Sequence, residues 1–265
     1  MAREAIRDAI REVNSTVAER PGEPAPEPKP HAVIWQRPQT RGRGPHPAHT
    51  RESITEAAVR LADEHGYEAI SMRRIAAEVG SGTMSLYRYV PSKEDLLDLM
   101  IDRVAGEYEL PEAPSGDLRA DLLDLARQGR ALLHRHPWMV QAMATVPSLG
   151  PNLLRHTDYL LGVLKATNLR PTEKFEEVAL LSGSIRNFVE FELAQRLQEQ
   201  RTGISAQQRN QAQMAYLGAV VAEGRYPNVT EVAVQSAAAG ADPQAGQNLD
   251  ELFERFILRV FGLTP

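Results

Sequence analysis

The stretch that decides the fold spans residues 71–97 and reads SMRRIAAEVGSGTMSLYRYVPSKEDLL. Ser71 can cap a helix, and the apolar residues after it recur at three- and four-residue intervals, as on one face of a short helix; they are Met72, Ile75, Ala76 and Val79. The glycines of GSG at residues 80–82 allow a sharp reversal, and a second short helix is predicted from about residue 83 to 89. Two short helices joined by a glycine turn predict a helix-turn-helix unit, whose second helix enters a DNA major groove.

The second of these helices has an apolar face and an exposed face. Leu86 and Val90 are expected to pack inward on the first helix. At the outer positions, two tyrosines and an arginine suit phosphates and base edges better than they suit a purely solvated face. We therefore predict DNA contacts from Thr83, Met84, Ser85, Tyr87, Arg88 and Tyr89. Lys93 follows Ser92, the predicted cap of the next helix, where backbone amides favour anions, so it is expected to contact a phosphate.

A longer segment, residues 50–97, resembles the TetR family of bacterial transcriptional regulators, which are tetracycline-repressor-like proteins. The resemblance rests on a first helix that ends in EHGY at residues 64–67, on IAAEVG at residues 75–80 and on LYRYVPSKE at residues 86–94. These pieces have the family's spacing without a gap.

This resemblance implies an all-α fold, with an N-terminal three-helix DNA-binding domain and a larger C-terminal helical domain for ligand binding and dimerisation. It implies a repressor that binds a palindromic double-stranded DNA operator as a homodimer and is released by a small-molecule effector. It also implies that Arg73, at the start of the middle helix, can reach DNA. Ser81 and Gly82 depart from the family pattern, which usually has an apolar residue and then a serine cap; glycine is a weaker but acceptable cap.

The composition is that of a soluble protein whose basic charge is confined to one part of the chain. The net charge is −5, yet residues 29–93 hold ten Lys and Arg against six Asp and Glu. Such a basic region is the electrostatic footprint of a nucleic-acid-binding domain. The sequence has no cysteine, no signal peptide pattern and no apolar run of roughly the 20 residues that span a bilayer. We expect a cytoplasmic protein with no membrane partner.

An N-terminal extension, residues 1–49, precedes the predicted DNA-binding domain. Residues 1–20 have apolar residues at helical spacing and predict an amphipathic helix, either docked on its own body or forming an added dimer contact. Residues 21–49 are rich in proline and arginine. Arg41 and Arg43 are expected to enter the minor groove as an N-terminal arm does, although a solvated linker is the alternative.

The DNA-binding domain is predicted over residues 50–96 and an effector-binding and dimerisation domain over residues 97–265. Nearly every window of the second domain is typical of a helix, except the Ala- and Gly-rich segment 227–247, which is partly helical or a loop. Soft, large apolar residues gather in its middle and either line a cavity or are ordinary core residues, and the resemblance to the TetR family implies an effector pocket between such helices. The predicted ligand-binding residues are His134, Trp138, Met139, Met143, Tyr159, Asn187, Phe188 and Met214. Wide apolar stripes at residues 173–200 and 248–261 favour these two helices as the dimer contact.

No catalytic, cofactor or metal motif is found in the sequence. There is no GxxxxGK phosphate loop, GxSxG elbow or HExxH pair. His134 and His136 are two residues apart on a helix and therefore cannot share a metal, and Glu190 and Glu192 lie on different faces of theirs. We expect no enzyme activity, no cofactor and no metal. The alternative function is an effector-independent architectural DNA-binding protein, and an enzyme on a helical scaffold is a third hypothesis.

Overall fold

The structure is a computed structural model that describes residues 33–37, 49–146, 148–238 and 248–263. These residues form helices, turns and loops, with no strand among them. The predicted helix over residues 1–20 lies outside the described residues, as do Arg41 and Arg43. Contacts divide the chain into Met1–Arg37, of which a 3₁₀ turn η1 (Ile34–Gln36) is described, and Pro38–Pro265.

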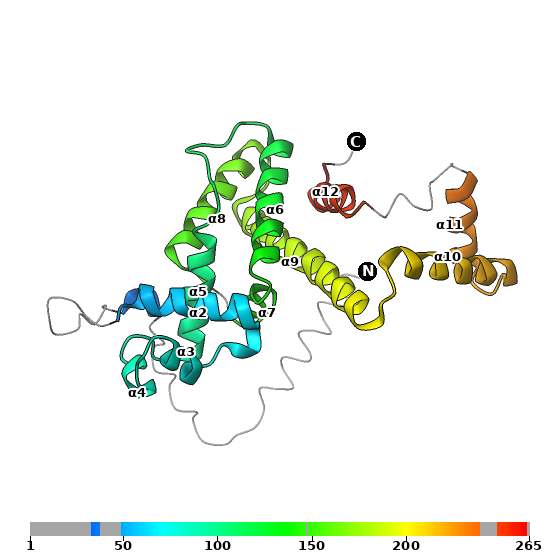
Figure 1. Ribbon diagram of the computed structural model, residues 1–265. Helices are drawn as coiled ribbons and strands as arrows, with labels where there is room; N and C mark the ends of the chain where they lie inside the picture. Colours follow the sequence, from blue (N-terminus) through cyan, green and yellow to red (C-terminus); the bar gives the residue numbers. More distant parts are fainter. Residues whose placement is uncertain (1–32, 38–48, 147, 239–247, 264–265) are drawn as a thin grey trace, which may run out of the picture. The chain divides into compact units, whose positions relative to one another are not determined.

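The helix-turn-helix unit forms as predicted, although its second helix is shorter than expected. The elements at this end are α2 (Arg51–His65), η2 (Tyr67–Ala69), α3 (Met72–Glu78), α4 (Thr83–Leu86) and α5 (Lys93–Ala105), shown in Figure 1. The side chain of Ser71 caps α3 by accepting from the Arg74 N–H, and that of Ser92 caps α5 by accepting from the Asp95 N–H. Gly82 offers α4 no such cap, and the chain continues from Leu86 to Tyr89 as a turn. Pro91 disfavours a helical conformation at Val90, so the helix cannot extend into α5.

The inward faces of these helices make one core. Residues of α2, α3, α4 and the turn after it that are 2% exposed or less form this core; they are Ile54, Ala57, Ala58, Ala62, Ile75, Ala76, Leu86 and Val90. Val79 is only half-buried. Helix α5 packs on α2 and also on α8 (Pro151–Val163), so the same helix contributes to the core at both of its ends. It therefore joins the DNA-binding helices to the larger set.

The larger set of helices is built around α9 (Pro171–Thr202). It also includes α6 (Leu118–Arg135), α7 (Met139–Thr145), η3 (Leu164–Ala166), α10 (Ala206–Glu223), α11 (Pro227–Ala238) and α12 (Leu249–Val260). Helix α9 contacts α6, α7, α8 and α12. The prediction left the segment 227–247 open between helix and loop; its first part is α11, and residues 239–247 are outside the described ranges. Among the described helices, none combines the length and apolar character that a membrane crossing requires.

Several large apolar side chains of α9, α10 and α11 remain exposed to solvent in the single chain. Phe175 is 61% exposed and Phe191 is 50% exposed on α9, and Tyr216 is 73% exposed on α10. Helix α10 packs on α11, and Figure 1 shows the two as neighbouring helices. Large exposed apolar groups of this kind mark a candidate interaction surface.

Candidate nucleic-acid interface and ligand cavity

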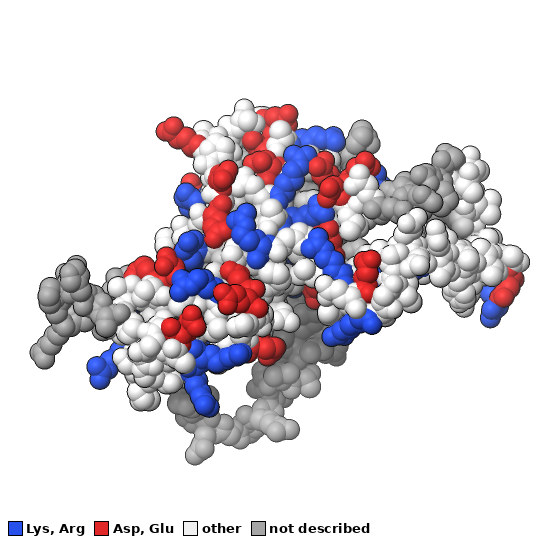
Figure 2. Space-filling model, viewed as in Figure 1, with Lys and Arg blue, Asp and Glu red and all other residues white. Residues whose placement is uncertain are grey.

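The predicted DNA-contacting residues that are described lie together on α3, α4 and the start of α5. Arg73, Met84, Tyr87 and Arg88 are exposed, with Met84 80% and Tyr87 40% exposed, while Thr83, Ser85 and Tyr89 are half-buried. Figure 2 shows basic side chains at the α3–α4 end of this view, with acidic ones among them.

Two local contacts hold the edges of this surface in place. The Nζ of Lys93 lies 5.1 Å from the centre of the Tyr67 ring, a cation–π contact that keeps the ammonium at the first turn of α5. The Nε of Arg51 donates to the Tyr89 carbonyl over 3.0 Å, which fixes the turn after α4 to α2. The exposed arginines, the tyrosine and the helix N-terminus therefore share one surface, which has the chemistry to bind a phosphate backbone and base edges.

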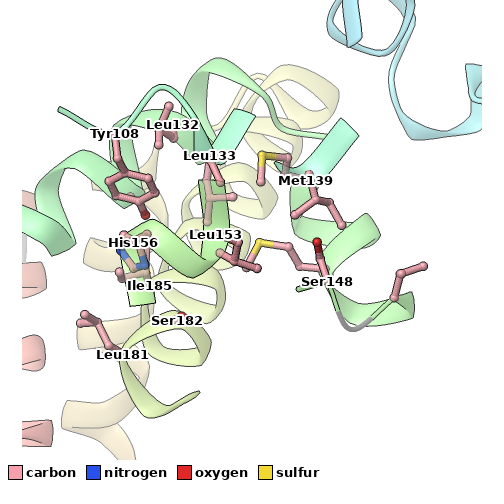
Figure 3. A pocket seen from close by; sticks show the side chains of 15 residues that line it. Tyr108, Leu132, Leu133, Met139, Ser148, Leu153, His156, Leu181, Ser182 and Ile185 are labelled. Carbon is pink, nitrogen blue, oxygen red and sulfur yellow. The ribbon is translucent and has the colours of Figure 1, made fainter. Parts of the chain in front are cut away.

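A cavity of about 220 Å³ lies between α5, α6, α7, α8 and α9. Figure 3 shows its side chains converging from these helices. The lining is mostly apolar and consists of Ile101, Ala105, Tyr108, Gly129, Leu132, Leu133, Met139, Met143, Val146, Ser148, Leu153, His156, Leu181, Ser182 and Ile185. No Asp, Glu, Lys or Arg is in this set. A concave apolar site with a few polar groups is typical of a small-molecule site.

Of the eight predicted ligand-binding residues, the structure brings two into this cavity, Met139 and Met143 of α7. Trp138 is buried, but its indole N–H points to Asp63. Phe188 packs on Phe253, with ring centres 5.0 Å apart. The other four do not line it either. Asn187 is exposed beside a separate groove next to Phe256, Met214 is exposed on α10, Tyr159 is half-buried on α8 and His134 bonds to Glu192.

The polar side chains of the cavity, above all His156 and Tyr108, were not predicted from the sequence. His156 is 5% exposed, and its ring centre is 4.3 Å from that of Tyr108. Burial lowers the pKa of His156 to about 4 and raises the pKa of the Tyr108 phenol. A feature of the sequence could have found His156, because it shares the apolar face of α8 with Leu153, Leu160 and Val163 at helical spacing.

A cluster of hydrogen bonds joins the DNA-binding helices to α7. Asp63 of α2 accepts at one oxygen from the Trp138 Nε1 and from the His136 Nδ1, each over 2.7 Å. The other ring nitrogen of His136 is 3.3 Å from Glu107, which also accepts from Arg135 over 2.7 Å. Burial would raise the pKa of Glu107, but the bonds from Arg135 and His136 outweigh it and lower that pKa. Since Met139 follows Trp138 directly, the wall of the cavity is hydrogen-bonded to α2.

A second cluster joins α6, α9 and α12. Glu192 of α9 is 2% exposed and accepts two bonds from Arg130, over 3.0 and 2.6 Å, and one from His134 over 2.8 Å. Arg130 also bonds to Asp250 over 2.7 Å. Burial would raise the pKa of Glu192, but Arg130 and His134 lower it. His134 is therefore a partner of Glu192, while Glu190 is exposed and pairs with Arg186. Within the described ranges, no group of His, Asp and Glu is arranged to hold a metal ion.

Known protein families match both the N-terminal and the C-terminal part of this chain. The family described as "Bacterial regulatory proteins, tetR family" matches residues 54–100, and "Tetracyclin repressor-like, C-terminal domain" matches residues 110–260. The HTH-type transcriptional repressor DrrR1 of Streptomyces coeruleorubidus is 40% identical over 196 residues, which are 74% of this chain and 73% of DrrR1.

Solved structures show the same fold. The TetR family protein ActR of Streptomyces coelicolor, in complex with actinorhodin, superposes with a TM-score of 0.64 at 23% identity, over 81% of this chain and 94% of ActR. Its complex with (S)-DNPA has a TM-score of 0.61 at 25% identity, over 82% of this chain and 98% of ActR. One family description covers more than half of the chain and DrrR1 most of it, so this chain is a DNA-binding transcriptional regulator of the TetR family.

Proposed function

We propose that two copies of this chain bind a palindromic operator as a repressor, and that a small molecule in the cavity releases them. One observation carries the ligand response: α7 lines the cavity with Met139 and Met143 and is hydrogen-bonded through Trp138 to Asp63 of α2. A ligand that moves α7 would therefore act on the helices that position α3 and α4. The protein would act in the cytoplasm as a regulator without enzyme activity.

The release is a population shift between two forms of the dimer. The effector binds better to the form in which the two α4 helices are wrongly spaced for successive major grooves. By linkage, operator DNA weakens effector binding by the same factor, typically 5- to 150-fold. ActR, which has this fold, was crystallised with actinorhodin and with (S)-DNPA. These complexes support a small-molecule effector for this chain as well.

Dimerisation is supported by the exposed apolar side chains of α9. One short recognition helix reads only a few base pairs, so a partner related by two-fold symmetry is required. Phe175, Leu180, Phe191 and Leu197 of α9 are 45% exposed or more in the single chain, whereas α12 buries Phe253 and Ile257 against its own chain. We propose that α9 forms most of the dimer contact and that α12 adds its half-buried edge.

The proposed DNA-binding domain is residues 50–96, with the effector and dimer domain at residues 97–265. The proposed contacts to DNA come from Arg73, Thr83, Met84, Ser85, Tyr87, Arg88, Tyr89 and Lys93. The arginines 41 and 43 stay a prediction because they are outside the described residues. Deletion of residues 37–45 should weaken operator binding several-fold and reduce its salt dependence, and unchanged binding would contradict an arm in the minor groove.

The test begins with selection of a binding site from random duplex DNA by the purified protein. The double variant Tyr87→Ala, Tyr89→Ala should abolish binding to the selected site, with the dimer and its Tm nearly unchanged, because Tyr87 is exposed and Tyr89 half-buried. Arg74→Ala is the matched control, since Arg74 is an exposed arginine of α3 that we expect to be only solvated. Selection of no palindrome, together with no ligand that raises the Tm, would favour the effector-independent architectural protein.

A further inference from the structure

Four polar side chains line the cavity, and they fall into two pairs. The Ser182 hydroxyl donates to the Val178 carbonyl over 3.1 Å within α9, and the Ser148 hydroxyl donates to Asp98. Neither the ring nitrogens of His156 nor the hydroxyl of Tyr108 makes a hydrogen bond with any other described residue. The cavity thus contains two polar groups whose bonding capacity is satisfied and two whose capacity is unused.

An unused polar group in such a place is costly to the fold. His156 is 5% exposed, with the ring of the half-buried Tyr108 against it, so its ring nitrogens have little access to solvent water. A buried donor or acceptor without a partner destabilises the fold, and native proteins keep few of them. A ligand that supplies the missing partners would recover this cost on binding. A hydrogen bond from a ligand to His156 or Tyr108 should therefore contribute more to the free energy of binding than a bond to either serine.

The charge of the lining restricts what can bind. With no Asp, Glu, Lys or Arg in the lining, a charged ligand would lose its hydration without meeting an opposite charge. The two nearby carboxylates of α5 are already engaged: Asp98 accepts from Ser148, and Asp102 accepts from the backbone N–H groups of Asn152 and Leu153. Burial lowers the pKa of His156 to about 4, so at neutral pH the imidazole is uncharged and has one N–H donor and one acceptor.

Resting on the proposed effector site, we propose that the cavity binds an uncharged, flat aromatic molecule with a carbonyl or phenolic oxygen that hydrogen-bonds to His156. The Tyr108 hydroxyl is the second polar contact. Figure 3 shows Tyr108 beside His156, with Met139 and Leu153 among the apolar walls around the same space. The methionines of α7 suit a ring system, because thioethers pack favourably against aromatic edges.

The test measures binding of three planar probes to the purified full chain at neutral pH by fluorescence titration. They are a dihydroxyanthraquinone, the same ring system with a sulfonate, and a cationic acridine. The dihydroxyanthraquinone should bind at least tenfold more tightly than either charged probe. Equal or tighter binding of a charged probe, or no measurable binding of the neutral one, would overturn the proposal.

Variants then test the two named groups. His156→Phe keeps a flat ring and removes both nitrogens, and should weaken the dihydroxyanthraquinone about tenfold, the effect of one hydrogen bond. Tyr108→Phe removes only a hydroxyl and should weaken it several-fold, which serves if His156→Phe does not fold. The matched control is Tyr159→Phe, because Tyr159 is a half-buried tyrosine of α8 that does not line the cavity, and binding should stay within about twofold. Wild-type affinity in both ring variants would refute the role of the pair.

These titrations contain no DNA, so they separate the ligand class from the proposed function. If the neutral probe binds through His156 but does not release the selected operator site, the ligand class stands and the release mechanism fails. If a charged compound releases the operator while the neutral probe does not bind, the release mechanism stands and the ligand class fails.

Discussion

His136 and His156 are equally buried, but their surroundings are opposite. His136 has a side chain 6% exposed and a carboxylate at each ring nitrogen, from Asp63 and Glu107. His156 is 5% exposed, lies against the Tyr108 ring and has no hydrogen-bond partner among the described residues. The first histidine joins helices of different parts of the fold, as Glu192 does between α6, α9 and α12. His156 forms no such hydrogen-bonded link between the described helices. Hydrogen-bonded polar groups thus join helices in this molecule, whereas the polar pair of the cavity is left for the proposed ligand.

We expect the largest effect on stability when the hydrogen-bonded cluster around Glu192 is broken. Glu192→Ala leaves Arg130, whose side chain is 16% exposed, without its main partner, and should lower the free energy of unfolding by about 3–5 kcal/mol. Thermal and urea unfolding of the dimer at pH 7 measure this loss. Glu190→Ala is the control two residues away, because its pair with Arg186 is at the surface, 3.6 Å apart, and should contribute less than about 1 kcal/mol. If both variants lower the free energy of unfolding by the same amount, the buried carboxylate of Glu192 contributes no more to stability than the exposed one of Glu190.

The unsatisfied histidine should make the fold sensitive to mild acid. The folded state holds the pKa of His156 at about 4, below its usual value of 6.5, so the unfolded chain binds the extra proton first as the pH falls. The contribution of the neutral His156 to the free energy of unfolding is therefore fully present above pH 6.5. It is lost between pH 6.5 and 4, by about 3 kcal/mol in total. The lowered pKa values of Glu107 and Glu192 reduce stability only at lower pH, below their usual value of 4.5.

Urea unfolding as a function of pH tests this difference. Between pH 6.5 and 4.5, His156→Phe should be much less sensitive to pH than the wild type, because phenylalanine binds no proton. If both proteins lose the same stability over that range, then the imidazole of His156 is not buried in its neutral form.

Local features of the fold were predictable from the sequence, and features that depend on distant partners were not. Ser71 and Ser92 were identified as caps because a cap depends on residues three positions away. Trp138 was assigned to the ligand because it is large and apolar, but its indole N–H bonds to Asp63, 75 residues earlier in the chain. The cavity brings together residues of five helices, and no periodicity within one helix indicates which of them meet. This is why Met139 was found and Tyr108 was missed.

The smallest expected effect concerns the bond that connects the two regions. Trp138→Phe keeps an aromatic ring in the core but removes the donor to Asp63, so the segment between α6 and α7 loses one of its two bonds to α2. The factor by which an effector weakens operator binding should fall about five- to tenfold, since one hydrogen bond contributes about 1 kcal/mol. Operator affinity is measured with and without the effector that a thermal-shift screen identifies. Arg127→Ala is the control, because its bond to Glu254 ties α6 to α12, away from α2. If Trp138→Phe leaves that factor unchanged while Asp63→Asn reduces it, the bond from Trp138 is not needed for the coupling. The coupling between the cavity and α2 then depends on the bond between His136 and Asp63.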